Sequence, residues 1–140
     1  MLYILDTDHI SLLQRQHPAV IKNLLATPVE DRAVTVITLA EQLQGRLAAF
    51  RRAKLEGERS HALQFLVQTV EFYQRIQVLP YGSAATAEFE RLRQNKLRVG
   101  SQDLRIAAIA LTNQATIVTR NRRDFIQVPN LDIADWTVSH

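Results

Sequence analysis

The sequence contains no cysteine among its 140 residues. Disulfides, zinc–thiolate sites and cysteine nucleophiles are therefore excluded. The four histidines, His9, His17, His61 and His140, show no H-x-x-x-H or similar pairing, which argues against a metal site built on imidazole. A bound metal would then be held by carboxylate oxygens, and such ligands select hard cations such as Mg²⁺ or Mn²⁺.

Long apolar runs are also missing. No run approaches the roughly 20 residues that span a bilayer, and the N-terminus lacks the basic segment followed by an apolar one that marks a signal peptide. We therefore expect no membrane segment and a cytoplasmic protein. Aromatic residues make up only 6% of the chain, so an extended base-stacking platform is not indicated, and Phe125 and Trp136 are expected in the core or a lid.

The chain is ordinary in size and balance for one soluble domain. Its hydrophobic residues account for 46% and its charged residues for 22%, which is enough to build a proper core over residues 1–140. The net charge of +3 is compatible with a polyanionic partner but is weak evidence for one.

Short apolar runs alternate with amphipathic segments along the chain. Residues 1–5, M-L-Y-I-L, suit a strand buried on both faces. Further strands are expected at 34–37, 77–79 and 115–119, with a last short one at 131–133 and a frayed tail to His140. Because helices separate these strands, the pattern predicts an α/β protein with a mainly parallel sheet.

The expected helices begin with 9–16, which Thr7 or Asp8 can cap, and 19–26. Thr38 is expected to cap a long helix that breaks near Gly57, and a second long helix is expected at 58–75. The two would form an α-hairpin at about 39–76 that projects from the sheet. The buried stripe predicted for the second helix is Leu63, Leu66, Val67, Val70 and Phe72. Two later helices are expected at 84–95 and 102–113.

Carboxylates follow the predicted strands. Asp6 ends the first strand, Glu41 lies in the first turn of the helix after the second, and Asn121 and Asp124 follow the strand that ends at Thr119. The carboxyl ends of parallel strands share an edge with the helix N-termini that follow them. These side chains should therefore meet at one edge of the sheet.

Each acidic residue also has a simpler explanation. Glu41 could complete a capping box with Thr38. Asp103 lies in a predicted helix that follows another helix, so the topology does not force it to this edge. Its negative charge in the first turn could simply interact favourably with the dipole of its own helix. Asn121 and Asp124 could be a cap and its partner. Taken together, however, crowded carboxylates repel unless a cation neutralises them, and such a cation would build a hydrolytic site.

Four stretches resemble the motifs of the PIN domain family, and in particular its VapC-type toxins from bacterial toxin–antitoxin pairs. The stretches are L-D-T-D with Asp6, V-I-T-L-A-E with Glu41, V-G-S-Q-D-L-R-I-A-A-I-A-L with Asp103, and I-V-T-R-N-R-R-D-F with Asn121 and Asp124. The resemblance covers essentially the whole chain, in order and at the expected spacings. It implies a three-layer α/β/α sandwich and a Mg²⁺- or Mn²⁺-dependent endoribonuclease. It also implies a VapB-like antitoxin, whose C-terminal segment lies across the active-site groove, and a homodimer.

The resemblance also implies roles for individual residues. Asp6 and Asp103 would be the main metal ligands, and Glu41 would bind the metal directly or through water. Thr7 and Thr119 match hydroxyl positions that support such sites. Asn121 departs from the pattern, because many relatives carry aspartate there, and Asp124 could supply the missing charge.

Basic residues flank the third and fourth motifs. Arg122 and Arg123, together with Arg120, could contact RNA phosphates without reading sequence. The basic residues from Arg91 to Arg98 fit a solvated helix face equally well.

Two other functions fit parts of the sequence. A haloacid-dehalogenase-type phosphatase would explain the D-x-D of Asp6 and Asp8. Its motif, however, requires a threonine at the position of Ile10 and a well-placed lysine, and the chain has neither. A PIN-like protein that binds RNA or a partner without cleaving would predict a degraded acidic set. Asn121 is the one residue in its favour.

Overall fold

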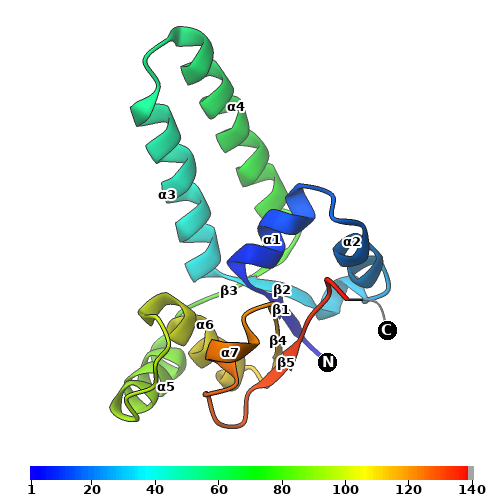
Figure 1. The fold of residues 1–140 in the computed structure, drawn as a ribbon, viewed down its shortest axis with the longest axis vertical. Coiled ribbons are helices and arrows are strands. Elements are labelled where there is room, and N and C mark those ends of the chain that lie inside the picture. The colour runs from blue at the N-terminus through cyan, green and yellow to red at the C-terminus, as the bar shows by residue number, and fades with distance from the viewer. Residues whose placement is uncertain (139–140) are drawn as a thin grey trace.

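Within residues 1–138, which the computed structural model describes, five parallel strands form one sheet (Figure 1). They are β1 (Tyr3–Leu5), β2 (Arg32–Thr35), β3 (Gln77–Leu79), β4 (Thr116–Val118) and β5 (Asp132–Ala134). The strand order is β3-β2-β1-β4-β5, with every neighbouring pair parallel. The predicted parallel α/β architecture is confirmed.

Helices cover both faces of this sheet. Ile4 and Ile117 join one core cluster with α5 (Ser83–Gln94) and α6 (Ser101–Thr112). The next residue of each strand, Leu5 and Val118, joins a second cluster with α1 (Thr7–Gln14) and α2 (Pro18–Leu25). Since successive side chains of a strand point to opposite faces, the central strands are buried on both sides, and the molecule is a three-layer α/β/α sandwich.

Two long helices extend away from the sheet, side by side (Figure 1). They are α3 (Val36–Arg52) and α4 (Glu56–Tyr73); the remaining short elements are the 3₁₀ helix η1 (Val29–Asp31) and α7 (Arg122–Phe125). The turn between the long helices falls at residues 53–55, and Gly57 lies inside the first turn of α4 rather than at the break. None of the helices in the described part of the chain is long and apolar enough to cross a bilayer.

The start of α3 differs from the prediction. Val36 and Ile37, expected in a strand, are its first helical residues, and Thr35 is its N-cap, with Oγ1 accepting a hydrogen bond from the Thr38 amide at 3.3 Å. β-Branched residues are only mildly disfavoured in helices, so the cap decides the boundary. The capping box of Thr38 and Glu41 is therefore wrong, and Glu41 lies in the second turn.

The predicted buried stripe of α4 is also wrong in part. Leu63, Val67 and Val70 are 43%, 56% and 44% exposed, whereas the buried residues of this helix are Ala62, Thr69 and Tyr73. Because α3 and α4 reach beyond the sheet, no other element of the described chain covers this part of α4, and Leu63 and Val67 line a surface hollow together with Phe50 of α3.

The C-terminal segment is ordered further than predicted. Trp136 is 6% exposed and belongs to the second core cluster, where its ring lies 5.6 Å from that of Tyr3. The Asn23 side chain donates to the Trp136 carbonyl at 3.0 Å. The expectation of a frayed tail fails for Trp136, while Ser139 and His140 lie outside the described residues. Phe125 is fully buried in the first cluster, as expected of a core residue.

The cap of α3 can be tested with Thr35→Val, which keeps the side-chain volume but cannot accept the Thr38 N–H. We expect the free energy of unfolding to fall by about 1 kcal/mol in urea denaturation. The matched control is Thr86→Val on the exposed side of α5, where a change within about 0.5 kcal/mol is expected. Equal stability of Thr35→Val and wild type would contradict the cap.

Candidate active site

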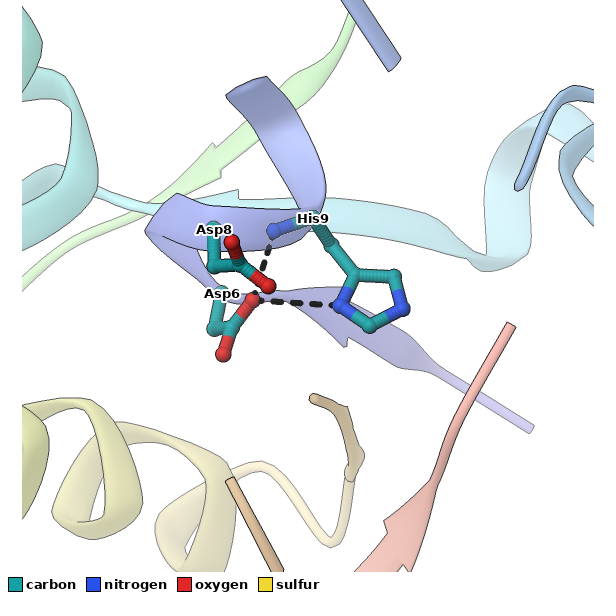
Figure 2. A group of neighbouring side chains, drawn as sticks. All are labelled: Asp6, Asp8 and His9. Carbon is teal, nitrogen blue, oxygen red and sulfur yellow. Dashed lines mark hydrogen bonds and ion pairs between the residues drawn. The ribbon is translucent and has the colours of Figure 1, made fainter. Parts of the chain in front are cut away.

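Asp6 occupies the point where β1 passes into α1. Its side chain is largely buried, and Oδ1 accepts a hydrogen bond from the His9 amide at 2.8 Å (Figure 2). Asp6 is therefore the N-cap of α1, and the prediction of Thr7 or Asp8 in that role is wrong. The Asp6 amide donates to the Val118 carbonyl at 3.1 Å, which joins the ends of β1 and β4. The strand order changes direction between these two strands, and ligands of open α/β sheets bind at such a place.

Hydroxyl groups connect Asp6 to α3. Thr7 Oγ1 lies 3.0 Å from Thr38 Oγ1 and donates to Glu41 Oε1 at 3.1 Å. Because Thr7 directly follows Asp6, this contact holds the Glu41 carboxylate at the end of β1.

The segment after β4 brings further polar groups to the same edge. Thr119 is fully buried, and its Oγ1 accepts a hydrogen bond from the Asn121 amide at 2.9 Å. The Asn121 side chain in turn donates to Asp124 Oδ2 at 2.9 Å. Thr119 thus shapes the turn, and Asn121 holds the Asp124 carboxylate.

Asp103, in the first turn of α6, belongs to this group although the topology does not force it there. Burial raises its pKa most, and the charges of Asp6, Glu41 and Asp124 raise it further. The side-chain amide of Asn121 lowers the pKa of Asp103. The same amide donates its hydrogen bond to Asp124 Oδ2. Four carboxylates therefore share one edge without a neutralising charge strong enough to offset their repulsion.

A second set of potential metal ligands lies beside Asp6. Among residues 1–138, only Asp6, Asp8 and His9 have three ligand atoms within 4.8 Å of one another; Asp6, Glu41 and Asp103 do not meet that criterion (Figure 2). Asp8, however, is already neutralised, because Arg120 binds its two oxygens at 2.7 Å each and holds its pKa below the usual range. His9 is fully buried, and its Nε2 accepts a hydrogen bond from the Trp136 amide.

The donor chemistry therefore favours the carboxylates of Asp6, Glu41 and Asp103 as a cation site. They are oxygen ligands, the type that Mg²⁺ and Mn²⁺ prefer. A divalent ion bound among them would offset the repulsion between their charges.

The predicted basic residues fall into two kinds. Arg122 and Arg123 are exposed on α7, next to Asn121. Arg91 and Arg93 instead form ion pairs with Glu88 and Glu90 one turn earlier on α5, which fits a solvated helix face.

Two buried polar residues near the site were not predicted. Gln42 accepts a hydrogen bond from the Tyr73 hydroxyl at 2.7 Å and donates to Gln14 at 3.2 Å, so it joins α3 to α4 and α1 beside Glu41. His9 contacts Asp6. The spacing of both residues in the sequence indicated a place near the site. Gln42 stands one helical turn after Thr38, and His9 stands three residues after Asp6, the carboxylate that caps its helix.

This fold and acidic edge define a class of protein with a parallel α/β/α sandwich and a carboxylate site at the topological switch point. The sequence model of the PIN domain family matches residues 3–131. The chain belongs to the PIN domain family.

Its curated relatives carry ribonuclease names. Ribonuclease VapC1 of Haemophilus influenzae (strain R2866) is 30% identical over 141 residues, covering 98% of this chain and 99% of the relative. Ribonuclease VapC2 of Rickettsia felis is 28% identical over 142 residues, covering 97% and 98%. The tRNA(fMet)-specific endonuclease VapC of Salmonella typhimurium is 27% identical over 139 residues, covering 96% and 97%.

Solved structures give the same fold. The structure of VapBC2 from Rickettsia felis bound to a promoter DNA fragment contains a chain with a TM-score of 0.71 and 27% identity, covering 97% of this chain and 99% of that one. The DNA-bound VapBC of Salmonella typhimurium has a TM-score of 0.78 at 24% identity, covering 97% and 99%, and supports the fold.

The raised pKa of Asp103 predicts how stability depends on pH without metal. Above the unfolded-state pKa of 3.8, the unfolded chain loses this proton first, so the free energy of unfolding falls as pH rises toward the higher folded-state pKa. Asp103→Asn should remove this component and stabilise the metal-free protein at neutral pH by no more than about 1 kcal/mol, because solvent screens this half-exposed carboxyl.

The measurement is urea denaturation in chelator from pH 3.5 to 8, comparing wild type with Asp103→Asn. The control is Asp132→Asn, at the exposed start of β5 on the opposite edge of the sheet, which should follow the wild-type curve. If Asp103→Asn destabilises the protein at pH 7, the repulsion inferred for Asp103 is absent.

Proposed function

We propose that this chain is a metal-dependent endoribonuclease of the VapC type, which hydrolyses RNA phosphodiester bonds at the carboxyl edge of its sheet with Mg²⁺ or Mn²⁺. The observation that carries the proposal is the gathering of carboxylates at one edge of the sheet, where Thr7 holds Glu41 beside Asp6 and Asn121 holds Asp124. Burial first, and then the charges of Asp6, Glu41 and Asp124, raise the pKa of Asp103 there. A protein that only needed stability would gain by replacing one of these carboxylates, whereas a cation site requires them. The family and the names of the relatives point to the same chemistry.

Asp6 and Asp103 are the proposed main metal ligands, and Glu41 binds directly or through water. A bound divalent ion supplies Lewis-acid activation of water and neutralises charge on the leaving oxygen. The residues of the chain provide the arrangement: Thr7 orients Glu41 through Oε1, and Asn121 orients Asp124. We propose that Asn121 acts by holding Asp124, which supplies the fourth negative charge.

RNA is the proposed substrate. Arg122 and Arg123 are exposed beside the acidic edge and can bind phosphates on either side of the cleaved bond without reading bases. The Salmonella relative is named for a tRNA, which supports structured RNA as the substrate class. The proposed location of the protein is the cytoplasm, where it would meet both an RNA substrate and a partner bound to DNA.

The proposed protein partner is a VapB-like antitoxin. The chains of similar fold come from VapBC complexes. Helix α4 exposes the apolar side chains of Leu63, Val67 and Val70. A protein partner could bury this apolar surface. The homodimer implied by the resemblance stays a prediction.

The phosphatase alternative gains no support from the site. Asp8, which would be the second aspartate of the D-x-D motif, is held by Arg120 in a bidentate ion pair. A non-cleaving PIN-like protein remains the second candidate, and an activity assay separates it from the nuclease.

The assay uses the chain purified without its partner and incubated with tRNA in Mg²⁺ or Mn²⁺. Cleavage should stop in chelator and fall by at least about 100-fold in Asp6→Asn. Asp132→Asn, at the opposite edge of the sheet, serves as the matched control and should cleave like wild type. Cleavage that persists in chelator, or that Asp6→Asn leaves intact, would sink the metal-nuclease proposal.

A further inference from the structure

We propose that His9 is a positioning residue of the metal site, whose Nδ1–H holds the Asp6 carboxylate so that Oδ2 is presented to the cation. This inference rests on the proposed function, because it concerns the ligand Asp6. It assigns a specific task to a histidine that sequence patterns gave no role.

The environment of His9 selects one form of the neutral ring. The side chain is fully buried, and Nε2 accepts a hydrogen bond from the Trp136 amide at 3.3 Å. An amide N–H can only donate, so Nε2 must offer its lone pair, and the ring proton of a neutral imidazole then sits on Nδ1. The position of the proton is thus set by the backbone of the C-terminal segment.

The Nδ1 atom points at Asp6 (Figure 2). It lies 3.3 Å from Asp6 Oδ1, just beyond the usual range of about 2.7–3.2 Å, and it makes no hydrogen bond within residues 1–138. A buried N–H without a partner is costly, so a small rotation that shortens this contact is favoured.

Oδ1 of Asp6 faces two nitrogens of one residue. The His9 amide donates to it at 2.8 Å, and the ring Nδ1 lies 3.3 Å from the same oxygen (Figure 2). With Oδ1 engaged, Oδ2 is the oxygen left for a cation. Hydrogen bonds of this kind fix the orientation of a metal-binding carboxylate.

The ordered C-terminal segment contacts the His9 ring at Nε2. Trp136 packs against Tyr3, and its carbonyl accepts a hydrogen bond from the Asn23 side chain. Asp135 Oδ1 lies 3.6 Å from Nε2, too far for a hydrogen bond. His9 therefore joins this segment to Asp6. A purely structural role would need only the Nε2 contact with Trp136, whereas a positioning role needs Nδ1.

Three substitutions separate the two roles. His9→Asn places an amide N–H near the Nδ1 position, His9→Gln places an amide oxygen near the Nε2 position, and His9→Leu provides neither. The readouts are Mn²⁺ affinity by titration calorimetry and the kcat and KM for RNA cleavage. We expect His9→Leu and His9→Gln to lose about 10–100-fold in Mn²⁺ affinity and in kcat, with KM little changed, and His9→Asn to restore most of both.

His17→Asn is the matched control, because it makes the same chemical change at the N-cap of α2, where asparagine is a good cap. It should bind Mn²⁺ like wild type. If wild type binds Mn²⁺ but His9→Leu binds it equally well, or if Gln restores binding and Asn does not, the positioning role is overturned. If wild type itself binds no Mn²⁺, the proposed function fails first.

A second measurement does not depend on any variant folding. Long-range ¹H–¹⁵N correlation spectra of the metal-free wild-type protein report which ring nitrogen carries the proton. We expect the Nδ1–H form for His9. An Nε2–H form would overturn the proposal, because Nδ1 could not then donate to Asp6.

Discussion

The mutual repulsion of carboxylates at one edge of the sheet is the constraint on which the rest of the site depends. Burial first, and then the charges of Asp6, Glu41 and Asp124, raise the pKa of Asp103. Arg120, which follows β4, binds both carboxylate oxygens of Asp8. The acidic edge is therefore left short of positive charge, and a divalent cation is the simplest way to supply it.

The fold holds these charges together by giving several residues two tasks. Asp6 follows β1 and caps α1 with one oxygen, which leaves the other for a ligand. Thr7 begins α1 while its hydroxyl holds Glu41. Thr119 follows β4 and shapes the turn that brings Asn121 to Asp124. Removing any of these contacts would loosen the site.

Much of this arrangement could be predicted from the sequence, because strand termini and chain topology determine it. The apolar runs of β1 and β4 placed Asp6 and Asn121 at the same edge, and the parallel order followed from the alternation of strands and helices. The placement of Asp103 rested on family resemblance, since α6 follows another helix. Local patterns failed where tertiary contacts decide: Val36 reads as a strand residue but follows a helix cap, and Val67 reads as buried but lies on a helix that projects past the sheet. Trp136, expected in the core or a lid, orders a tail that was expected to fray because it lies at a chain terminus.

The most direct test of the cation site is anomalous diffraction from crystals grown with Mn²⁺, recorded at the manganese absorption edge. We expect a peak within about 2.5 Å of carboxylate oxygens from both Asp6 and Asp103, on the side of Asp6 that faces away from His9. A peak between Asp6, Asp8 and His9, with the Asp8–Arg120 ion pair broken, would contradict the assignment of the ligands. No peak at the acidic edge would contradict the claim that its charge is balanced by a metal.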